Sequence, residues 1–207
     1  MSRSDRVTAH LGLGSNLGDR LVTLESAIWS LDESDGIAVT DVSGIYETDA
    51  WGPIEQDAYL NAVVEVATTL SPRELLVEVQ AIEQAFGRDR DREERWGPRP
   101  LDIDILLYGD EVVDEPDLVI PHPRIGERAF VLVPLMEVMP GGTLPDGTRL
   151  TRLVSALAPI TGIDLHVRME DPPGRTRMKR PEGPRGPAAR LAGDWTPPRG
   201  APPGTER

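Results

Sequence analysis

Two carboxylates lie in a short apolar stretch near the middle of the chain, and their spacing points to metal chemistry. The stretch Leu101–Tyr108 is predicted to be a strand, because its residues are large and β-branched and a glycine follows it. Side chains alternate faces along a strand, so Asp102 and Asp104 share one face. The other face is expected to carry Leu101, Ile103, Ile105 and Leu107. Two such carboxylates repel each other and resist burial, and a divalent cation would relieve both effects.

Arginines stand directly before this strand. Arg95 and Arg99 flank the stiff turn Trp96-Gly97-Pro98. Guanidinium groups match phosphate oxygens in shape and charge, and magnesium prefers one or two carboxylates together with substrate phosphates. Acids for a metal beside arginines for phosphate indicate phosphoryl-type transfer. An isolated Asp-x-Asp pair is also common at solvated strand ends and turns, so the surrounding residues carry this interpretation.

The elements around this strand follow from hydrophobic periodicity and turn residues. Ser71 and Glu74 form a predicted capping box, with Pro72 at the first helical position. The expected order is strand, helix, strand, strand, helix, strand, at residues 7–13, 20–31, 37–48, 59–70, 71–86 and 101–108. This order predicts an α+β fold of the ferredoxin-like, or split βαβ, type. It implies a mostly antiparallel sheet with both helices on one face.

The rest of the chain divides into a folded part and a tail. An acidic turn and short strand at 111–119, an apolar run from Phe130, a short helix at 149–156 and an edge strand at 163–167 are expected after the central strand. Proline and glycine are frequent from Asp171 onwards, and apolar residues are few. Such a segment cannot bury enough surface to offset its chain entropy. We therefore expect a catalytic domain at 1–168 and a disordered, basic tail at 169–207.

Composition excludes several classes of function. The formal charge of −13 argues against general nucleic-acid binding, and the absence of cysteine excludes disulfides and thiolate zinc sites. No apolar run approaches the roughly 20 residues needed to span a bilayer, and no secretory leader is visible, so a cytoplasmic location is expected.

The glycine-rich turn at 12–19 lacks the spacing of a nucleotide loop. We interpret it as architectural, with Asn16 or Asp19 capping the following helix.

The motif Arg95-Trp96-Gly97-Pro98-Arg99-x-Leu101-Asp102-Ile103-Asp104 resembles the signature of the 6-hydroxymethyl-7,8-dihydropterin pyrophosphokinase family. The resemblance runs from about residue 8 to about residue 157 and does not include the tail. It implies transfer of the ATP diphosphoryl group to a pterin hydroxymethyl, with ATP as co-substrate and two Mg²⁺ ions held by Asp102 and Asp104. From charge and hydropathy we expect no nucleic-acid or membrane partner, and we expect a monomer.

The same resemblance assigns the other site residues. Arg88 and Arg99, with the two aspartates, are the implied catalytic residues. The implied pterin-binding residues are Thr48, Tyr59, Asn61 and Phe130. The implied ATP-binding residues are Gln80, Glu83, Arg90, Arg95, Trp96, His122 and Arg128. Judged by spacing alone, Tyr59 and Phe130 would be ordinary core residues, and His122 would be a surface histidine.

Two departures from the family pattern and two rival functions stay open. Asp49-Ala50-Trp51 stands where Pro-Pro-Leu is common, and the arginine loop is one residue longer between Arg90 and Arg95. A metal-dependent nucleotidyltransferase on a ferredoxin-like sheet would also use paired aspartates and ATP, but it would release pyrophosphate. A non-enzymatic ligand-binding domain of the same fold would bind its ligand without magnesium.

Overall fold

The computed structural model describes residues 6–50, 56–89 and 97–169. Its main sheet has six antiparallel strands in the order β5-β1-β4-β3-β8, and β2 pairs with β4 beside β3. The strands span β1 Val7–Ser15, β2 Ile37–Val42, β3 Ile45–Thr48, β4 Tyr59–Thr68, β5 Asp102–Tyr108 and β8 Ile163–Val167. A separate hairpin pairs β6 Val113–Glu115 with β7 Leu118–Ile120. The order and directions confirm the expected ferredoxin-like arrangement.

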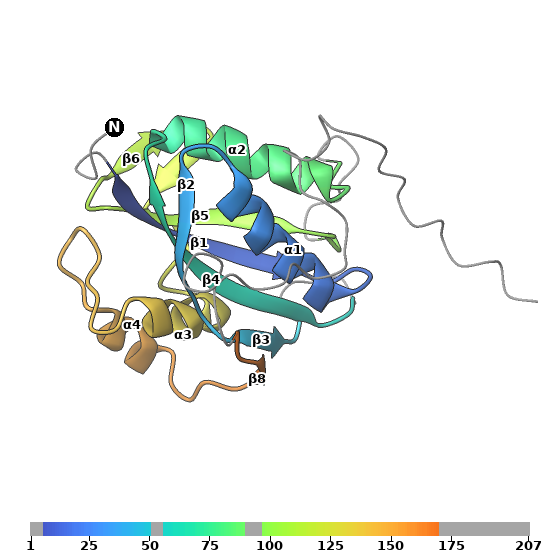
Figure 1. Cartoon of the computed structure of the whole chain (residues 1–207). Coiled ribbons are helices and arrows are strands. Elements are labelled where there is room, and N and C mark those ends of the chain that lie inside the picture. Colours follow the sequence, from blue (N-terminus) through green and yellow to red (C-terminus); the bar gives the residue numbers. More distant parts are fainter. Residues whose placement is uncertain (1–5, 51–55, 90–96, 170–207) are drawn as a thin grey trace, which may run out of the picture.

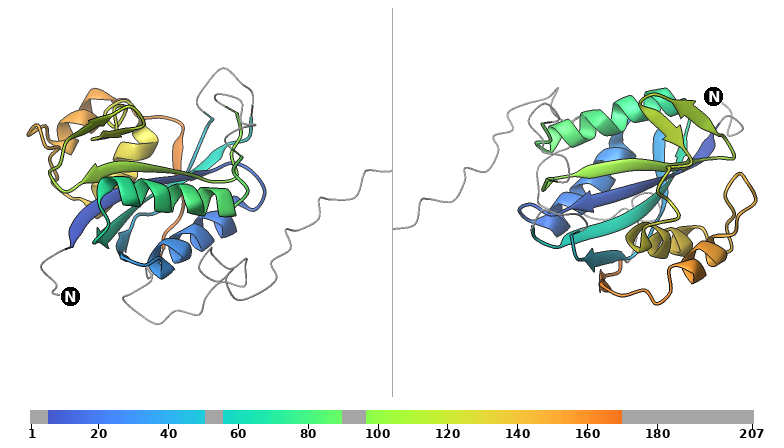
Figure 2. Two further views of the ribbon diagram at one scale, coloured as in Figure 1. Left: turned by 90° about the horizontal axis from the view of Figure 1, so that it is seen from above. Right: turned by 180° about the vertical axis from the view of Figure 1, so that it is seen from behind.

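Helices cover both faces of the sheet (Figure 1 and Figure 2). Helix α1 (Arg20–Glu33) and helix α2 (Pro72–Ala85) lie on one face, where they bury the main hydrophobic cluster with residues such as Leu11, Val64 and Ile105. Helix α3 (Ala129–Val138) and helix α4 (Leu150–Ala156) lie on the other face with Val63 and Leu106. The fold therefore has three layers, and the C-terminal helices leave part of the second face open for a site.

Local signals placed helices α1, α2 and α4, whereas the stretch expected only as an apolar run from Phe130 forms helix α3. The Ser71 hydroxyl accepts from the Glu74 amide and the Glu74 carboxylate accepts from the Ser71 amide, so the predicted capping box is present. The Asp19 carboxylate accepts from the Val22 amide at 3.2 Å and caps α1. Asn16, the other candidate cap, has a different role that is described below.

Two expectations about strands are wrong. The single strand expected at 37–48 is divided into β2 and β3, because Ser43 turns its hydroxyl inward to accept from the Val63 amide at 2.9 Å. Leu107 does not share a face with Ile105, because the pairing of β1 with β5 shifts between His10 and Leu11 and leaves Leu106 as an extra residue. This bulge breaks the alternation of side chains.

The C-terminal part follows the sequence prediction in part: the short helix and the edge strand are present, but the single short strand expected at 111–119 is the hairpin of β6 and β7. The edge strand β8 pairs with β3, and Met169 packs against the main core. Apart from Met169, the tail predicted at 169–207 lies outside the described residues, so its disorder stays a prediction. Within the described ranges, no helix is long and apolar enough to cross a membrane.

Candidate active site

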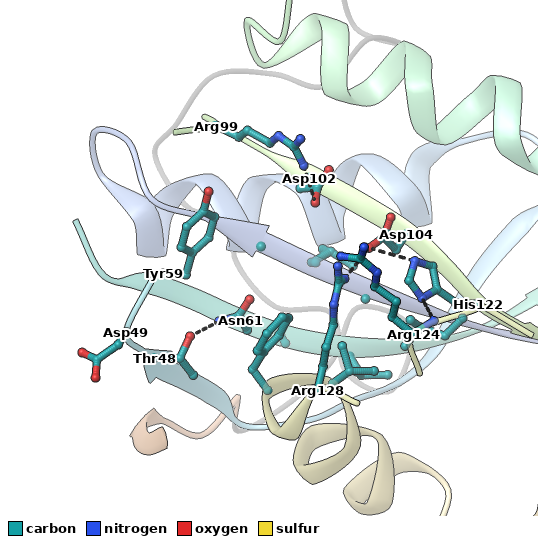
Figure 3. Close-up of a pocket in the computed structure, with 18 of the residues that line it drawn as sticks. Thr48, Asp49, Tyr59, Asn61, Arg99, Asp102, Asp104, His122, Arg124 and Arg128 are labelled. Atoms are coloured by element: carbon teal, nitrogen blue, oxygen red, sulfur yellow. Dashed lines mark hydrogen bonds and ion pairs between the residues drawn. The ribbon is translucent and has the colours of Figure 1, made fainter. Parts of the chain in front are cut away.

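A cavity of about 320 Å³ opens on the face of the sheet that carries α3. Its walls come from the ends of β3, β4 and β5, from the turn after β7 and from the first turn of α3 (Figure 3). Nine of the predicted site residues line it: Thr48, Tyr59, Asn61, Arg99, Asp102, Asp104, His122, Arg128 and Phe130. Tertiary structure thus brings together side chains that are separated by up to 82 positions in the chain.

Glycines form the floor of this cavity. Strand β1 lies between β4 and β5, and its register places Gly14 between Asn61 and Asp102. In the same way, Gly12 lies between Val63 and Asp104. A Cβ at Gly14 would come within 3.2 Å of the Asn61 side-chain oxygen. The interpretation of these two glycines as part of a tight turn is therefore wrong: they lie inside a strand, and their missing side chains leave room for a ligand.

The first carboxylate is held by two arginines. Arg88 forms ion pairs with both Asp102 and the buried Glu83, and Arg99 lies 3.2 Å from the other oxygen of Asp102. The Glu83 carboxylate also accepts from the Ile103 amide at 2.7 Å. These contacts lock the start of β5 onto the end of α2, and they fix the direction of the Asp102 side chain.

The second carboxylate is less well compensated. His122 Nε2 and Arg128 Nη1 lie 3.8 and 3.7 Å from one oxygen of Asp104, beyond ordinary hydrogen-bond length. Burial, together with the negative charge of Asp102, raises the pKa of Asp104 to about 7. Binding a cation would stabilise the ionised form of such a carboxylate. The donor set therefore fits a hard divalent metal such as magnesium, with Asp102 and Asp104 as its protein ligands.

Positive charge accumulates opposite Asp104. Burial and the charge of Arg128 lower the pKa of His122 to about 4, so its imidazole is neutral at physiological pH. The Arg124 amide donates to His122 Nδ1 at 3.2 Å, and this bond leaves Nε2 turned toward the carboxylate. Arg124 and Arg128 both line the cavity from the same side (Figure 3). This wall can receive an anion with several oxygens.

The other half of the cavity is flatter and less charged. The Asn61 amide donates to the Thr48 hydroxyl at 2.8 Å, which aligns two polar groups along the edge of the space. Tyr59 and Phe130 supply aromatic surface. Such a combination suits a flat heterocycle with a polar edge.

Asn16 fastens the loops beside the site. Its buried side chain donates to Gln56 Oε1 at 2.9 Å and accepts from the Arg99 amide at 2.7 Å. Its own amide donates to the Arg99 carbonyl at 3.2 Å. The residue expected as a possible helix cap thus ties together the segments that carry Tyr59 and Arg99.

Several predicted residues lie elsewhere. Arg88 and Glu83 are buried beneath Asp102, and Gln80 is half-buried on α2, so none of the three is among the residues that line the cavity. Arg90, Arg95 and Trp96 lie outside the described residues, as does the longer stretch of the arginine loop. Asp49, a departure from the family pattern, lies at the edge of the cavity.

Sequence reasoning missed Arg124 and the floor glycines. A usable signal for Arg124 was its place directly after Pro121-His122-Pro123, a rigid corner that already carried a predicted site residue. For the glycines, the signal was a two-residue spacing within a strand, which puts both on one face.

Comparison with known proteins identifies the family. Residues 10–140 match the model of the 7,8-dihydro-6-hydroxymethylpterin-pyrophosphokinase family. The chain belongs to this family.

Curated pyrophosphokinases align with most of the folded part of this chain. The 2-amino-4-hydroxy-6-hydroxymethyldihydropteridine pyrophosphokinase of Bacillus subtilis is 48% identical over 130 residues, which are 63% of this chain and 77% of that protein. The enzyme of the same name from Pseudomonas aeruginosa is 41% identical over 155 residues, which are 75% of this chain and 94% of that protein.

Solved structures agree on the fold. The Plasmodium falciparum HPPK-DHPS protein, crystallised with STZ-DHP, superposes with a TM-score of 0.58 at 16% identity over 75% of this chain and 44% of that chain. The present chain therefore spans less than half the length of that solved protein, and the likeness concerns the pyrophosphokinase fold alone.

Proposed function

We propose that this chain transfers the diphosphoryl group of ATP to the hydroxymethyl group of 6-hydroxymethyl-7,8-dihydropterin, giving AMP and the pterin diphosphate. Family membership supports this reaction. The observation that carries it furthest is the division of one cavity into a flat, amide-edged half and a half with two carboxylates opposed by arginines. These halves suit a pterin and a polyphosphate, and they meet where the hydroxyl would attack.

The reaction depends on positioning the reactants and stabilising charge more than on a covalent enzyme intermediate. The hydroxymethyl oxygen forms a bond to the β-phosphorus, the bond between that phosphorus and the α-phosphate oxygen breaks, and the hydroxyl proton is released. The donor carries about four negative charges, and charge develops on the AMP leaving group. Fixed positive groups in a water-poor site therefore account for most of the expected rate enhancement.

Asp102 and Asp104 hold the magnesium in this proposal, and two ions serve one ATP. When bound, magnesium supplies positive charge among the phosphates and lowers the pKa of the substrate hydroxyl. The raised pKa of Asp104 supports a cation site here, because an unneutralised carboxylate is costly in this position.

The arginines neutralise phosphate charge, and the neutral imidazole of His122 donates a hydrogen bond to phosphate. Arg99, Arg124, Arg128 and His122 bind ATP oxygens from two sides of the cavity, and Arg88 acts with Arg99 on the transition state. Arg88 also orients Asp102, which its buried ion pair with Glu83 supports. We keep Gln80, Arg90, Arg95 and Trp96 as proposed ATP contacts on the strength of the family motif. Glu83, which is buried beneath Asp102, acts in this proposal by holding Arg88.

The pterin lies between Tyr59 and Phe130 in this proposal. The amide of Asn61 and the hydroxyl of Thr48 recognise its polar edge, and their mutual bond of 2.8 Å preorganises them. We further propose a cytoplasmic monomer that acts on small molecules and has no nucleic-acid or membrane partner.

Phosphorus NMR of ATP, magnesium and 6-hydroxymethyl-7,8-dihydropterin with the purified protein tests the reaction. AMP together with an organic diphosphate is the expected result. ADP would indicate ordinary kinase chemistry, and pyrophosphate would indicate the rival nucleotidyltransferase. Pterin binding without magnesium and without turnover would favour the non-enzymatic binding domain.

A further inference from the structure

Glu137, near the end of α3, connects two elements that each carry pocket residues. One carboxylate oxygen accepts from the Tyr46 hydroxyl at 2.6 Å, and the other accepts from the Gly44 amide at 2.6 Å. Tyr46 is buried, and its pKa is raised to about 12 by burial and by the bond to Glu137. The hydroxyl therefore stays protonated at physiological pH and can donate to Glu137 throughout that range.

Both the helix and the strand extend from this contact to the pocket. Phe130 and Glu137 are seven residues apart, which is about two helical turns, so they lie on the same side of α3. Tyr46 and Thr48 are two residues apart on β3 and share its face. The helix and the strand are thus pinned to each other at one end, while their other ends carry Phe130 and Thr48 into the cavity.

Helix α3 depends on such a tertiary contact. No side chain caps its start at Arg128, and Pro134 has no amide hydrogen to donate to the carbonyl of Phe130. The turn that presents Arg128 and Phe130 therefore has fewer internal hydrogen bonds than an ordinary helix. Its position must be set by packing and by the bonds that Glu137 makes farther along the helix.

We propose that Glu137 is a positioning residue for the pterin: by tying α3 to β3 it sets the width of the slot between Phe130 and Thr48. This inference rests on the proposed function, because it names the pterin as the ligand of that slot. The two carboxylates and Arg99 belong to β5 and to the loop before it, whereas the bonds of Glu137 go to Gly44 and to Tyr46 on β3. Of the proposed ATP-binding residues, Arg128 lies at the start of α3 and shares in the effect. Glu137 is therefore expected to act on the pterin, through both walls of its slot, more strongly than on ATP.

The test measures two affinities separately, together with steady-state kinetics. Glu137→Ala is expected to raise KM and Kd for 6-hydroxymethyl-7,8-dihydropterin by about tenfold or more, the usual effect of removing a charged hydrogen-bond acceptor. The Kd of a non-hydrolysable ATP analogue with magnesium is expected to change by less than about threefold, because Arg128 is one of several proposed phosphate-binding residues. Glu137→Gln should stay near the wild type, since an amide can accept from Gly44 and donate to Tyr46.

Arg168→Ala is the matched control. Arg168 reaches Glu137 at 3.4 Å from the solvent side and is largely exposed, so this variant should behave as the wild type. An equal change in pterin and ATP affinities in Glu137→Ala, or no change in either, would overturn the inference. If Glu137→Ala does not fold, Tyr46→Phe decides: a selective loss of pterin affinity supports the inference and an unchanged affinity refutes it. Failure of the wild type to bind the pterin would refute the proposed function itself.

Discussion

Asp102 and Asp104 lie two residues apart on one strand but meet different surroundings. Asp102 is paired with Arg88 and Arg99. Near Asp104, Arg128 lies at 3.7 Å and the neutral imidazole of His122 lies at 3.8 Å. The site therefore contains one compensated carboxylate and one whose charge is costly in this structure. If Asp104 binds the proposed magnesium, the asymmetry is stability given up for function at a binding site.

Asp104→Asn tests that asymmetry. The variant should lose turnover by at least about a thousandfold, because an amide is a poor magnesium ligand. At pH 8 without magnesium its free energy of unfolding should be equal to or higher than that of the wild type, since a partly desolvated negative charge beside Asp102 is gone. Enzyme assays and urea unfolding measure the two effects, with the exposed Asp114→Asn as control. Near-normal turnover would refute the metal assignment.

His10 makes stability depend on pH. It is buried beside Glu65, whose other oxygen accepts from the Thr40 hydroxyl at 2.6 Å. Burial lowers the pKa of His10 below its ordinary value near 6.5, although Glu65 opposes this shift. The unfolded chain therefore binds a proton at a higher pH than the folded chain does, and stability is lost as the pH falls below that value.

Denaturant unfolding between pH 5 and pH 8 checks this expectation. The contribution of His10 to the free energy of unfolding should fall toward acid pH, by at most about 1.4 kcal/mol per pH unit for one group. It is measured as the difference between the wild type and His10→Leu, because the raised pKa of Asp104 makes a contribution of opposite sign in the same range. Identical slopes would mean that His10 titrates alike in both states.

At the scale of elements, β1 is the strand on which the site is built. It pairs with both β4 and β5, so it sets the distance between the amide-edged half and the carboxylate half of the cavity. Its glycines leave the floor empty, and Asn16 just beyond its end holds the flanking loops. One strand thus positions two groups of side chains without contributing side chains of its own to the floor.

Gly14→Ala should narrow that floor. Its new Cβ would lie 3.2 Å from Asn61 Oδ1 and 3.7 Å from Tyr59, so the Asn61 amide must shift. We expect KM for the pterin to rise by about tenfold, consistent with misplacing one or two hydrogen bonds. Gly126→Ala, where the nearest atom is a Leu153 methyl at 3.4 Å, should leave KM unchanged. Steady-state kinetics measure both KM values. Equal KM values for the two variants would contradict the proposal that Gly14 keeps the floor of the cavity open.

At the scale of the whole molecule, charge is distributed unevenly. The net charge is −13, although the 37 residues from Asp171 carry eight basic and four acidic groups. The last residue in the sequence that lines the cavity is Val131, and the family match ends at residue 140. The tail therefore adds no residue to the described site, and its charge would act on the acidic body through weak, screened attraction.

A chain that stops after Met169 tests the part played by the tail. We expect kcat and both KM values within about twofold of the full chain at physiological salt, where attraction between exposed charges is largely screened. A modest difference is expected at low ionic strength. A tenfold loss at physiological salt would show that the tail takes part in substrate binding.

Local pattern alone predicted much of this protein. The capping box at Ser71, the order of helices and strands, and the shared face of Asp102 and Asp104 follow from periodicity and turn chemistry, which act over a few residues. The long motif around Trp96 identified the family, and with it nine residues that do line the cavity.

Tertiary structure decided the rest. The bulge at Leu106, the break at Ser43, the glycine floor and the carboxylate of Glu137 all depend on which strand pairs with which, and in what register. Register is a property of two segments distant in sequence, so the pattern of either segment alone does not contain it. For the same reason the different environments of Asp102 and Asp104, which set their separate electrostatic states, emerged only once the arginines and His122 were placed around them.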